Sequence, residues 1–157
     1  MNDRTSIYET LVSELTRTGE LFRLSATEAR LLAILYVENR PITLEQMGDL
    51  IGKSKTSVHI AIRNLSHQEL VDRVWVKGAR KDFYTSVSNV YKKLMTSQIE
   101  QWRAQTNRQV EIMQYMEKSI SDNDPEFLSM QKQVSSSLQF HKQAAAIIKK
   151  ITAISSC

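Results

Sequence analysis

The sequence is poor in the residues that interrupt regular secondary structure, with four glycines and two prolines among 157 residues. That scarcity argues against β-sandwiches, collagen-like repeats and flexible linkers, and it favours long helices. No apolar run reaches the roughly 18 residues of a membrane-spanning helix, so a membrane partner is not expected. The contents of 41% hydrophobic and 24% charged residues fit one ordinary globular chain.

Cysteine is almost absent, since Cys157 is the only one in the sequence. One cysteine cannot build an internal disulfide framework, which indicates a reducing compartment. The N-terminal residues Met1 to Arg4 do not begin the apolar segment of a secretory signal. We therefore expect a cytoplasmic protein.

Positive charge is concentrated in one part of the chain. The formal net charge is +4, and residues 53–81 hold seven lysines and arginines against two acidic residues, which gives this segment +5 and the remainder −1. A basic block inside a nearly neutral chain is typical of proteins that bind an anionic partner. The alternative is a solvated surface that happens to be rich in cations.

The first part of the chain predicts two helices. Residues 5–22 carry one narrow apolar stripe, made of Ile7, Leu11, Leu15 and Phe22. Ser25 and Glu28 have the spacing of a capping box, in which each side chain satisfies a free backbone amide of the other residue. The following residues 29–37 are apolar almost all round, which predicts a central core helix that Pro41 ends.

The next segment predicts a helix-turn-helix. A helix restarts at Ile42, with Thr43 and Gln46 again at capping-box spacing, and stops at Gly52, which can adopt the left-handed conformation of a tight turn. Ser54 is a good N-cap for a further helix. The inward positions of this helix are expected to be Val58, Ala61, Ile62 and Leu65. Two short helices joined by a few residues with a glycine in the turn are typical of this motif.

A change of periodicity then predicts a β-hairpin. Residues 71–76 and 83–87 are rich in β-prone side chains, and the segment 77–81 between them contains Gly78 and three cations. A helix-turn-helix followed directly by a hairpin with a basic tip is the layout of a winged helix. We therefore expect a mainly α fold with a small β wing, in which residues 24–89 form a DNA-binding domain.

The C-terminal part predicts two long helices separated by residues 121–125, with Asp124 as N-cap and Pro125 as the first residue of the second helix. Helices of roughly 30 and 27 residues span about 40–45 Å. Their apolar stripes are expected at Leu94, Ile99, Trp102, Val110, Met113, Met116 and Ile120, and at Phe127, Met130, Val134, Leu138, His141, Ala145, Ile148 and Ile151. Such stripes usually pack against a second chain, so residues 90–157 predict a homodimer. The N-terminal helix within residues 1–23 is expected to take part in the same dimerisation. A hairpin of helices within one chain is the alternative.

The predicted second helix of the helix-turn-helix motif carries candidate DNA contacts. Its outward positions include polar and cationic side chains, and its positive N-terminal end can hold a phosphate. Arg63 can offer a bidentate fork to guanine, and Arg80 can enter a narrow minor groove. The full set of predicted contacts is Ser54, Lys55, Thr56, Ser57, His59, Arg63, Lys77, Arg80 and Lys81. An ion pair of Arg63 with Glu69 or Asp72 is the competing interpretation.

Three stretches together resemble a known family. They are Ser54-Lys55-Thr56-Ser57-Val58, then Arg63-Asn64-Leu65, then the segment from Val74 to Tyr84 that contains Lys77-Gly78-Ala79-Arg80-Lys81. They resemble the recognition helix and wing of the GbsR branch of the MarR-like winged-helix regulators, over about residues 24–95. The resemblance implies a dimeric transcriptional repressor that binds a pseudo-palindromic operator in double-stranded DNA.

The same resemblance implies control of genes for uptake or synthesis of the osmoprotectant glycine betaine from choline. It also implies a small quaternary ammonium effector, which aromatic side chains could hold through cation–π contacts. The candidate aromatic residues are Tyr36, Trp75, Tyr91, Trp102 and Tyr115. The alternative is that these aromatic residues belong to the core.

Chemistry of other kinds is not expected. Gly52-Lys53-Ser54 resembles the end of a phosphate-binding loop, but Met47 stands where that motif needs a glycine. The three histidines have no ligand partners at metal-binding spacing, and no paired carboxylates suggest an active site. The sequence therefore predicts a protein that is not an enzyme and has neither a metal nor a cofactor. A thiol switch at Cys157 could act only between chains.

Two further functions stay open at this point. A winged helix can serve as a protein-interaction adaptor that docks a partner through its long C-terminal helices. It can also be an architectural protein that binds DNA without regard to sequence. Replacement of Arg80 and Lys81 by alanine separates a DNA-binding regulator from the adaptor, because DNA affinity should fall with a shallower salt slope whereas a partner complex should be unaffected.

Overall fold

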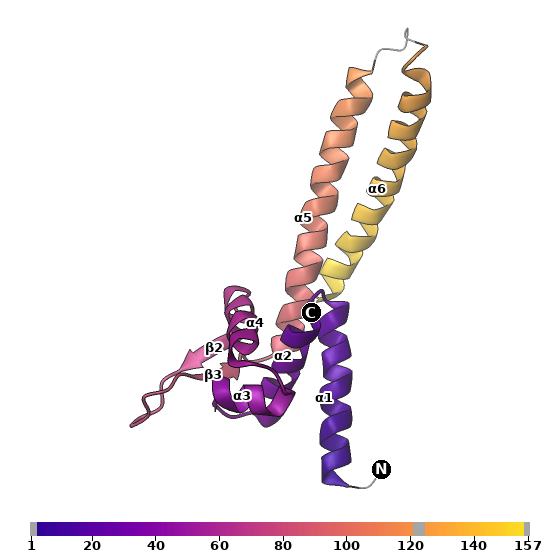
Figure 1. Ribbon diagram of the computed structural model, residues 1–157. Helices are drawn as coiled ribbons and strands as arrows, with labels where there is room; N and C mark the ends of the chain where they lie inside the picture. The colour runs from indigo at the N-terminus through magenta and orange to yellow at the C-terminus, as the bar shows by residue number, and fades with distance from the viewer. Residues whose placement is uncertain (1–2, 121–124, 156–157) are drawn as a thin grey trace. The chain divides into compact units, whose positions relative to one another are not determined.

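The computed structural model describes residues 3–120 and 125–155. The predictions for Asp124 and Cys157 lie outside these residues. The chain divides into two compact units, residues 1–95 and residues 96–157, which are described separately. Figure 1 shows the order of the elements along the chain.

The first unit contains the N-terminal helices, the small sheet and the first turn of a long helix. Its elements are α1 (Arg4–Leu21), α2 (Ala26–Glu38), β1 (Ile42–Thr43), α3 (Leu44–Ile51), α4 (Lys55–His67), β2 (Val71–Val74), β3 (Phe83–Ser86) and the start of α5 (Val90–Ser119). This is a winged helix-turn-helix, mainly α with a small β wing, as the sequence predicts.

Helix α2 is the centre of the core, as its uninterrupted apolar character predicts. Its residues from Leu31 to Leu35 are all buried. The capping box also forms: the Glu28 amide donates to Ser25 Oγ at 3.2 Å, and the Ser25 amide donates to Glu28 Oε2 at 3.1 Å. The helix ends at Glu38, where Asn39 takes the left-handed conformation with φ 49°. Pro41 therefore lies beyond the end of α2 and does not terminate it, contrary to the prediction.

The apolar stripe predicted for α1 is wrong in part. Ile7 and Leu11 are exposed, whereas Val12 is buried and Tyr8 and Leu15 pack against the core. The face of α1 that packs on α2 is therefore rotated by one residue from the predicted one. A stripe of isolated apolar residues does not reveal which side a neighbouring helix covers, because both sides of α1 carry large side chains.

The wing sheet has three antiparallel strands in the order β1-β3-β2, with Ile42 opposite Tyr84 and Val71 opposite Ser86. The prediction that a helix restarts at Ile42 is therefore wrong, because Ile42 pairs with β3 and α3 begins at Leu44. The strands of the hairpin are also shorter than predicted. Trp75 lies beyond β2, and its side chain is 80% exposed.

The second unit consists of the rest of α5 and helix α6 (Leu128–Ser155). Val134 and Leu138 are buried, and Ser135 Oγ of α6 donates to Glu117 Oε1 of α5 at 2.7 Å. Pro125 is not the first helical residue as predicted, because residues 125–127 form a turn before the helix begins. None of the helices in the described ranges combines the length and the apolar character needed to cross a bilayer.

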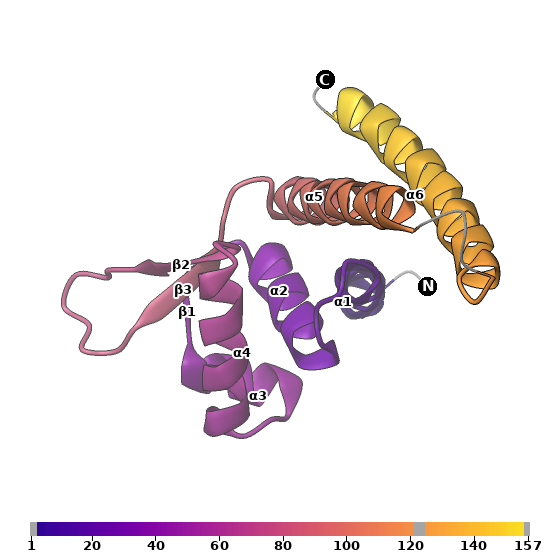
Figure 2. The same cartoon turned by 90° about the horizontal axis from the view of Figure 1, so that it is seen from above.

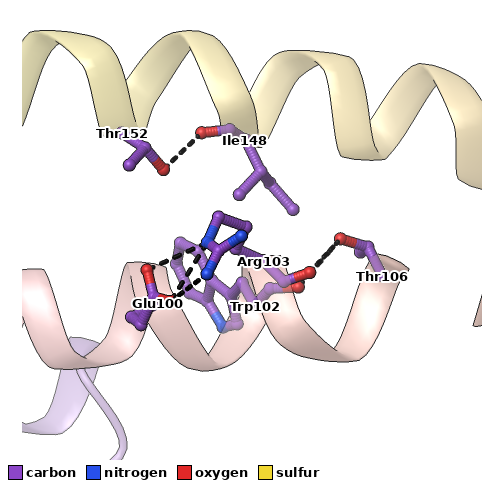
Figure 3. A network of polar contacts seen from close by, with 6 residues as sticks. All are labelled: Glu100, Trp102, Arg103, Thr106, Ile148 and Thr152. Atoms are coloured by element: carbon purple, nitrogen blue, oxygen red, sulfur yellow. Dashed lines mark hydrogen bonds and ion pairs between the residues drawn. The ribbon is translucent and has the colours of Figure 1, made fainter. Parts of the chain in front are cut away.

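Neighbouring parts of α5 and α6 face one another in this unit. Figure 3 shows Ile148 of α6 pointing toward α5 at the level of Trp102 and Arg103. Glu100 and Arg103 form an ion pair along α5, and Thr152 Oγ1 donates to the Ile148 carbonyl at 3.0 Å along α6. The polar contacts drawn there lie within single helices, so they do not hold the two helices together.

Candidate nucleic-acid interface

The turn between α3 and α4 brings the two helices of the motif together. Gly52 has φ 65° and closes α3, and the Lys53 amide donates to the Gly48 carbonyl at 3.2 Å. A side chain at position 52 would be strained in this left-handed conformation. Met47 of α3 and Val58 of α4 are fully buried beneath the turn, which holds α4 in place.

The N-terminus of α4 is capped by its own hydroxyl groups. The Ser57 amide donates to Ser54 Oγ at 3.2 Å, and the two hydroxyls are 3.1 Å apart. Both predicted contacts are thus engaged in the cap, while Lys55 and Thr56 beside them are exposed. The cap presents the positive end of α4 to solvent, where a phosphate can approach it.

One face of α4 is buried and the opposite face is free, as the sequence predicts. Val58, Ala61, Ile62 and Leu65 are all buried. The outward face carries the exposed side chains of Lys55, Thr56, His59, Ile60 and Arg63. This face combines cations, hydroxyl and imidazole groups with one apolar side chain, which suits the mixed chemistry of base edges and phosphates.

Arg63 does not form the ion pair with Glu69 or Asp72 that was the competing interpretation. Glu69 instead pairs with Lys93, whose Nζ lies 3.4 Å from Glu69 Oε2 and donates to the Glu69 carbonyl at 2.8 Å. Within residues 3–120 and 125–155, no ion pair or hydrogen bond engages the Arg63 guanidinium. The guanidinium is therefore available to a ligand.

A residue that the sequence analysis missed anchors α4 to the core. Asn64 Nδ2 donates to Glu28 Oε1 at 2.9 Å, while the other oxygen of this carboxylate completes the capping box of α2. The Glu28 carboxylate thus holds both the start of α2 and the middle of α4. The sequence places a polar asparagine directly before the inward-facing Leu65, but nothing in it identifies Glu28 as the partner.

The wing is a hairpin with exposed cations at its tip. Gly78 has φ 81°, and the Ala79 amide donates to the Val76 carbonyl at 3.1 Å, which closes a tight turn that needs glycine at this position. Where the strands meet the loop, Arg73 of β2 pairs with Asp82 at 2.5 Å. Figure 2 shows the β2–β3 loop extending away from α3 and α4.

A hollow of about 240 Å³ joins the wing to the helix-turn-helix. Lys55 of α4 lines it together with Arg80 and Lys81 of the wing, so cations from two separate elements of the predicted DNA surface meet there. Lys81 also pairs with Glu45 of α3 at 2.5 Å. A hydrogen bond from Lys81, and its positive charge, hold the pKa of the Glu45 carboxyl below its usual value.

The predicted aromatic residues do not form one cluster. Tyr36 and Tyr91 meet edge to face, with ring centroids 5.3 Å apart, and burial raises the pKa of the Tyr91 hydroxyl. Trp75 lies exposed in the wing and stacks on no ring within the described residues. Trp102 and Tyr115 belong to the second unit and are also exposed. The structure thus brings two of the five together.

Metal-binding clusters are not found in the part of the chain that the structure describes, where no three histidine, cysteine or acidic side chains gather. The exposed surface of α4 and the wing carries hydrogen-bond donors and positive charges. It has the chemistry to bind a polyanion.

The sequence is similar to two proteins named as helix-turn-helix transcriptional regulators. No family model matches the chain. In Bacillus subtilis (strain 168), the HTH-type transcriptional repressor OpcR is 24% identical over 114 residues, which are 73% of this chain and 62% of OpcR. The putative HTH-type transcriptional regulator YvaV of the same organism is 27% identical over 85 residues, 54% of this chain and 48% of YvaV. The matched part thus spans less than two thirds of either relative.

A solved structure supports the fold over almost the whole chain. The crystal structure of a transcriptional regulator has a TM-score of 0.57 at 13% identity, and covers 95% of this chain and 97% of that one. Regulators of this kind are typically not enzymes. The chain is thus related in sequence to helix-turn-helix transcriptional regulators, and its own fold is a winged helix-turn-helix.

Proposed function

We propose that this chain is a sequence-specific DNA-binding transcriptional regulator. The observation that carries the proposal is the exposed outward face of α4, which lies beside a wing whose cations share a hollow with Lys55. A helix with a buried apolar face and a free polar face can enter the major groove. The relatives named as HTH-type regulators support the same function.

Six of the predicted contacts, and the exposed Ile60 beside them, then have a role on DNA. Arg63 reads guanine O6 and N7, His59 and Thr56 contact base edges, and Ile60 packs on a thymine methyl group. Lys55 holds a phosphate beside the start of α4, because an ammonium group positions the protein without reading sequence. In the wing Arg80 enters the minor groove, and Lys77 contacts a flanking phosphate.

We further propose that the chain acts as a homodimer. Three large apolar side chains of α6 are left uncovered within the single chain: Phe140 is 63% exposed, Ile147 is 59% exposed and Ile154 is 76% exposed. They recur at helical spacing, as in a stripe that a second copy covers. A two-fold dimer would place two recognition helices about 34 Å apart, on half-sites separated by about 10 base pairs.

The resemblance to the GbsR branch extends the proposal to repression and to an effector. OpcR is named a repressor, which supports the same sign of regulation here. The edge-to-face pair of Tyr36 and Tyr91 offers an aromatic surface for a quaternary ammonium ion such as choline or glycine betaine. Release of bound DNA on titration with either compound, lost in Tyr36→Ala, tests this part of the proposal.

The test of DNA binding is selection of genomic fragments by the purified protein at about 150 mM salt. The matched control is an Arg63→Ala, Arg80→Ala double variant, since both side chains are exposed and their loss leaves the core intact. We expect a few fragments that share one pseudo-palindrome, and we expect the variant to lose them. Choline transport or betaine synthesis genes beside those fragments would support the osmoprotectant role.

Two other outcomes would contradict the proposal. Fragments without a common sequence would indicate an architectural protein. Equal recovery of fragments by the double variant would remove α4 and the wing from the interaction, and would favour an adaptor that binds a protein partner.

A further inference from the structure

The hollow between the wing and the helix-turn-helix contains an acidic side chain that DNA binding does not need. Glu45 stands in the first turn of α3 and lines the hollow together with Lys55, Arg80 and Lys81. A carboxylate in this place opposes the approach of any polyanion. We therefore asked which side chain Glu45 engages and how that contact affects DNA binding.

The geometry shows which cation Glu45 engages. Lys81 Nζ lies 2.5 Å from Glu45 Oε2, while the other carboxylate of the hollow, Asp82, is paired with Arg73. Glu45 and Lys81 are 36 residues apart in sequence, so the pair joins the wing to α3. Lys55 adds a second positive charge that favours the ionised form of Glu45.

The pair is too exposed to serve mainly as a structural link. The side chain of Lys81 is 67% exposed and that of Glu45 is 66% exposed. Ion pairs in such surroundings contribute little to folding, because water screens both charges. The same exposure means that a phosphate oxygen can reach Lys81 from solvent and replace the carboxylate oxygen.

We propose that Glu45 occupies the place of a DNA phosphate oxygen on Lys81 and competes with the DNA backbone for this wing cation. The competition lowers affinity for every duplex by a similar factor, because backbone phosphates are the same in all sequences. Sequence discrimination by α4 is left unchanged, so the pair lowers binding to operator and to non-operator DNA alike. This inference rests on the proposed function.

Competition has a signature that distinguishes it from simple repulsion. When Glu45 is neutralised, Lys81 is free to bind one more phosphate, so the salt dependence of binding should steepen by about 0.9 in log–log slope. The gain should also depend on Lys81. A Lys81→Gln substitution should therefore cost more affinity in the Glu45→Gln background than in the wild type.

The experiment measures binding of the full chain to an operator duplex and to an unrelated duplex of equal length, at several salt concentrations. The variants are Glu45→Gln, Lys81→Gln and the double variant. Glu14→Gln is the control, because Glu14 is also an exposed carboxylate in an ion pair, with Arg17 of α1 at 2.9 Å. Circular dichroism verifies that each variant is folded.

We expect Glu45→Gln to tighten binding to both duplexes by about three- to tenfold, and the control to change it by less than about twofold. Most of the gain should vanish when Lys81 is also replaced. An unchanged or weaker affinity of Glu45→Gln would overturn the inference, as would a gain that persists in full without Lys81. Absence of DNA binding by the wild type would instead overturn the proposed function.

Discussion

The winged-helix unit closes its own core, whereas the second unit leaves much of its apolar surface uncovered. Leu31, Leu65 and Val90 of the first unit are fully buried. In the second unit α6 buries Val134 and Leu138 but exposes the large side chains at Phe140 and Ile147. Burial of apolar area is the main favourable contribution to folding, and the first unit obtains it within itself to a greater extent than the second unit does.

This difference in burial indicates that the two regions have different roles. A short helix such as α4 can present a free polar face because its other face is held by a complete core. Long helices with little burial between them gain stability when another surface covers them. We therefore expect substitutions in the first unit to act on folding and DNA binding, and those on the free face of α6 to act on association.

The largest effect should come from Leu65→Ala in the buried face of α4. Removal of a fully buried leucine leaves a cavity and costs about 2–5 kcal/mol of unfolding free energy. Chemical denaturation measures the loss, with Ile60→Ala on the exposed face of the same helix expected to cost about 0.5 kcal/mol or less. Equal losses for the two variants would contradict the division of α4 into a buried and a free face.

Association should be broken by Ile147→Glu on the free face of α6. A charge in an apolar contact must be desolvated, so the dissociation constant of the dimer should rise by about tenfold or more. Sedimentation velocity measures the shift toward monomer, and Lys149→Glu is the control because position 149 is already exposed and charged. An unchanged association state would show that a second copy does not cover this face.

A smaller effect is expected from Asn64→Ala, which removes the hydrogen bond that holds α4 to Glu28. The loss should be about 1 kcal/mol of stability, with weaker operator binding because α4 is less well oriented. Glu28→Gln keeps one acceptor oxygen for the two donors, Ser25 N and Asn64 Nδ2, so it should also lose stability. If Asn64→Ala were to weaken stability but leave operator affinity intact, the contact would not orient the recognition helix.

The smallest effect should be a pH dependence at Tyr8. Burial, followed by the hydrogen bond to Glu38 at 2.8 Å, raises the pKa of the Tyr8 hydroxyl from 10.0 to about 12. The folded chain therefore keeps this proton after the unfolded chain has lost it. Stability from this group is complete below pH 10 and is lost as the pH rises toward 12.

Substitution of Tyr8 by phenylalanine removes the ionisable group and tests this dependence. The decline of unfolding free energy between pH 10 and 12 should become shallower in Tyr8→Phe, as measured by urea denaturation across that interval. Identical declines in the two proteins would mean that the Tyr8 hydroxyl is not held neutral by the fold.

Local features of the fold could be predicted from the sequence. Both capping boxes form, as does the left-handed turn at Gly52, because each depends on residues within three or four positions of one another. The inward face of α4 was equally predictable, since Val58 and Leu65 lie two helical turns apart. The face of α1 that packs inward and the strand at Ile42 were not, because distant elements decide them.

The sequence by itself determined the starts of α2 and α4, the end of α3, the mainly α fold with a basic wing, and which side of α4 is polar. Capping, periodicity and charge are short-range properties of the chain. Only the tertiary structure decided that Glu28 holds Asn64 and that Glu45 holds Lys81, each pair separated by 36 residues. A residue's type states what it can bind, but folding selects which distant partner comes within reach of a hydrogen bond.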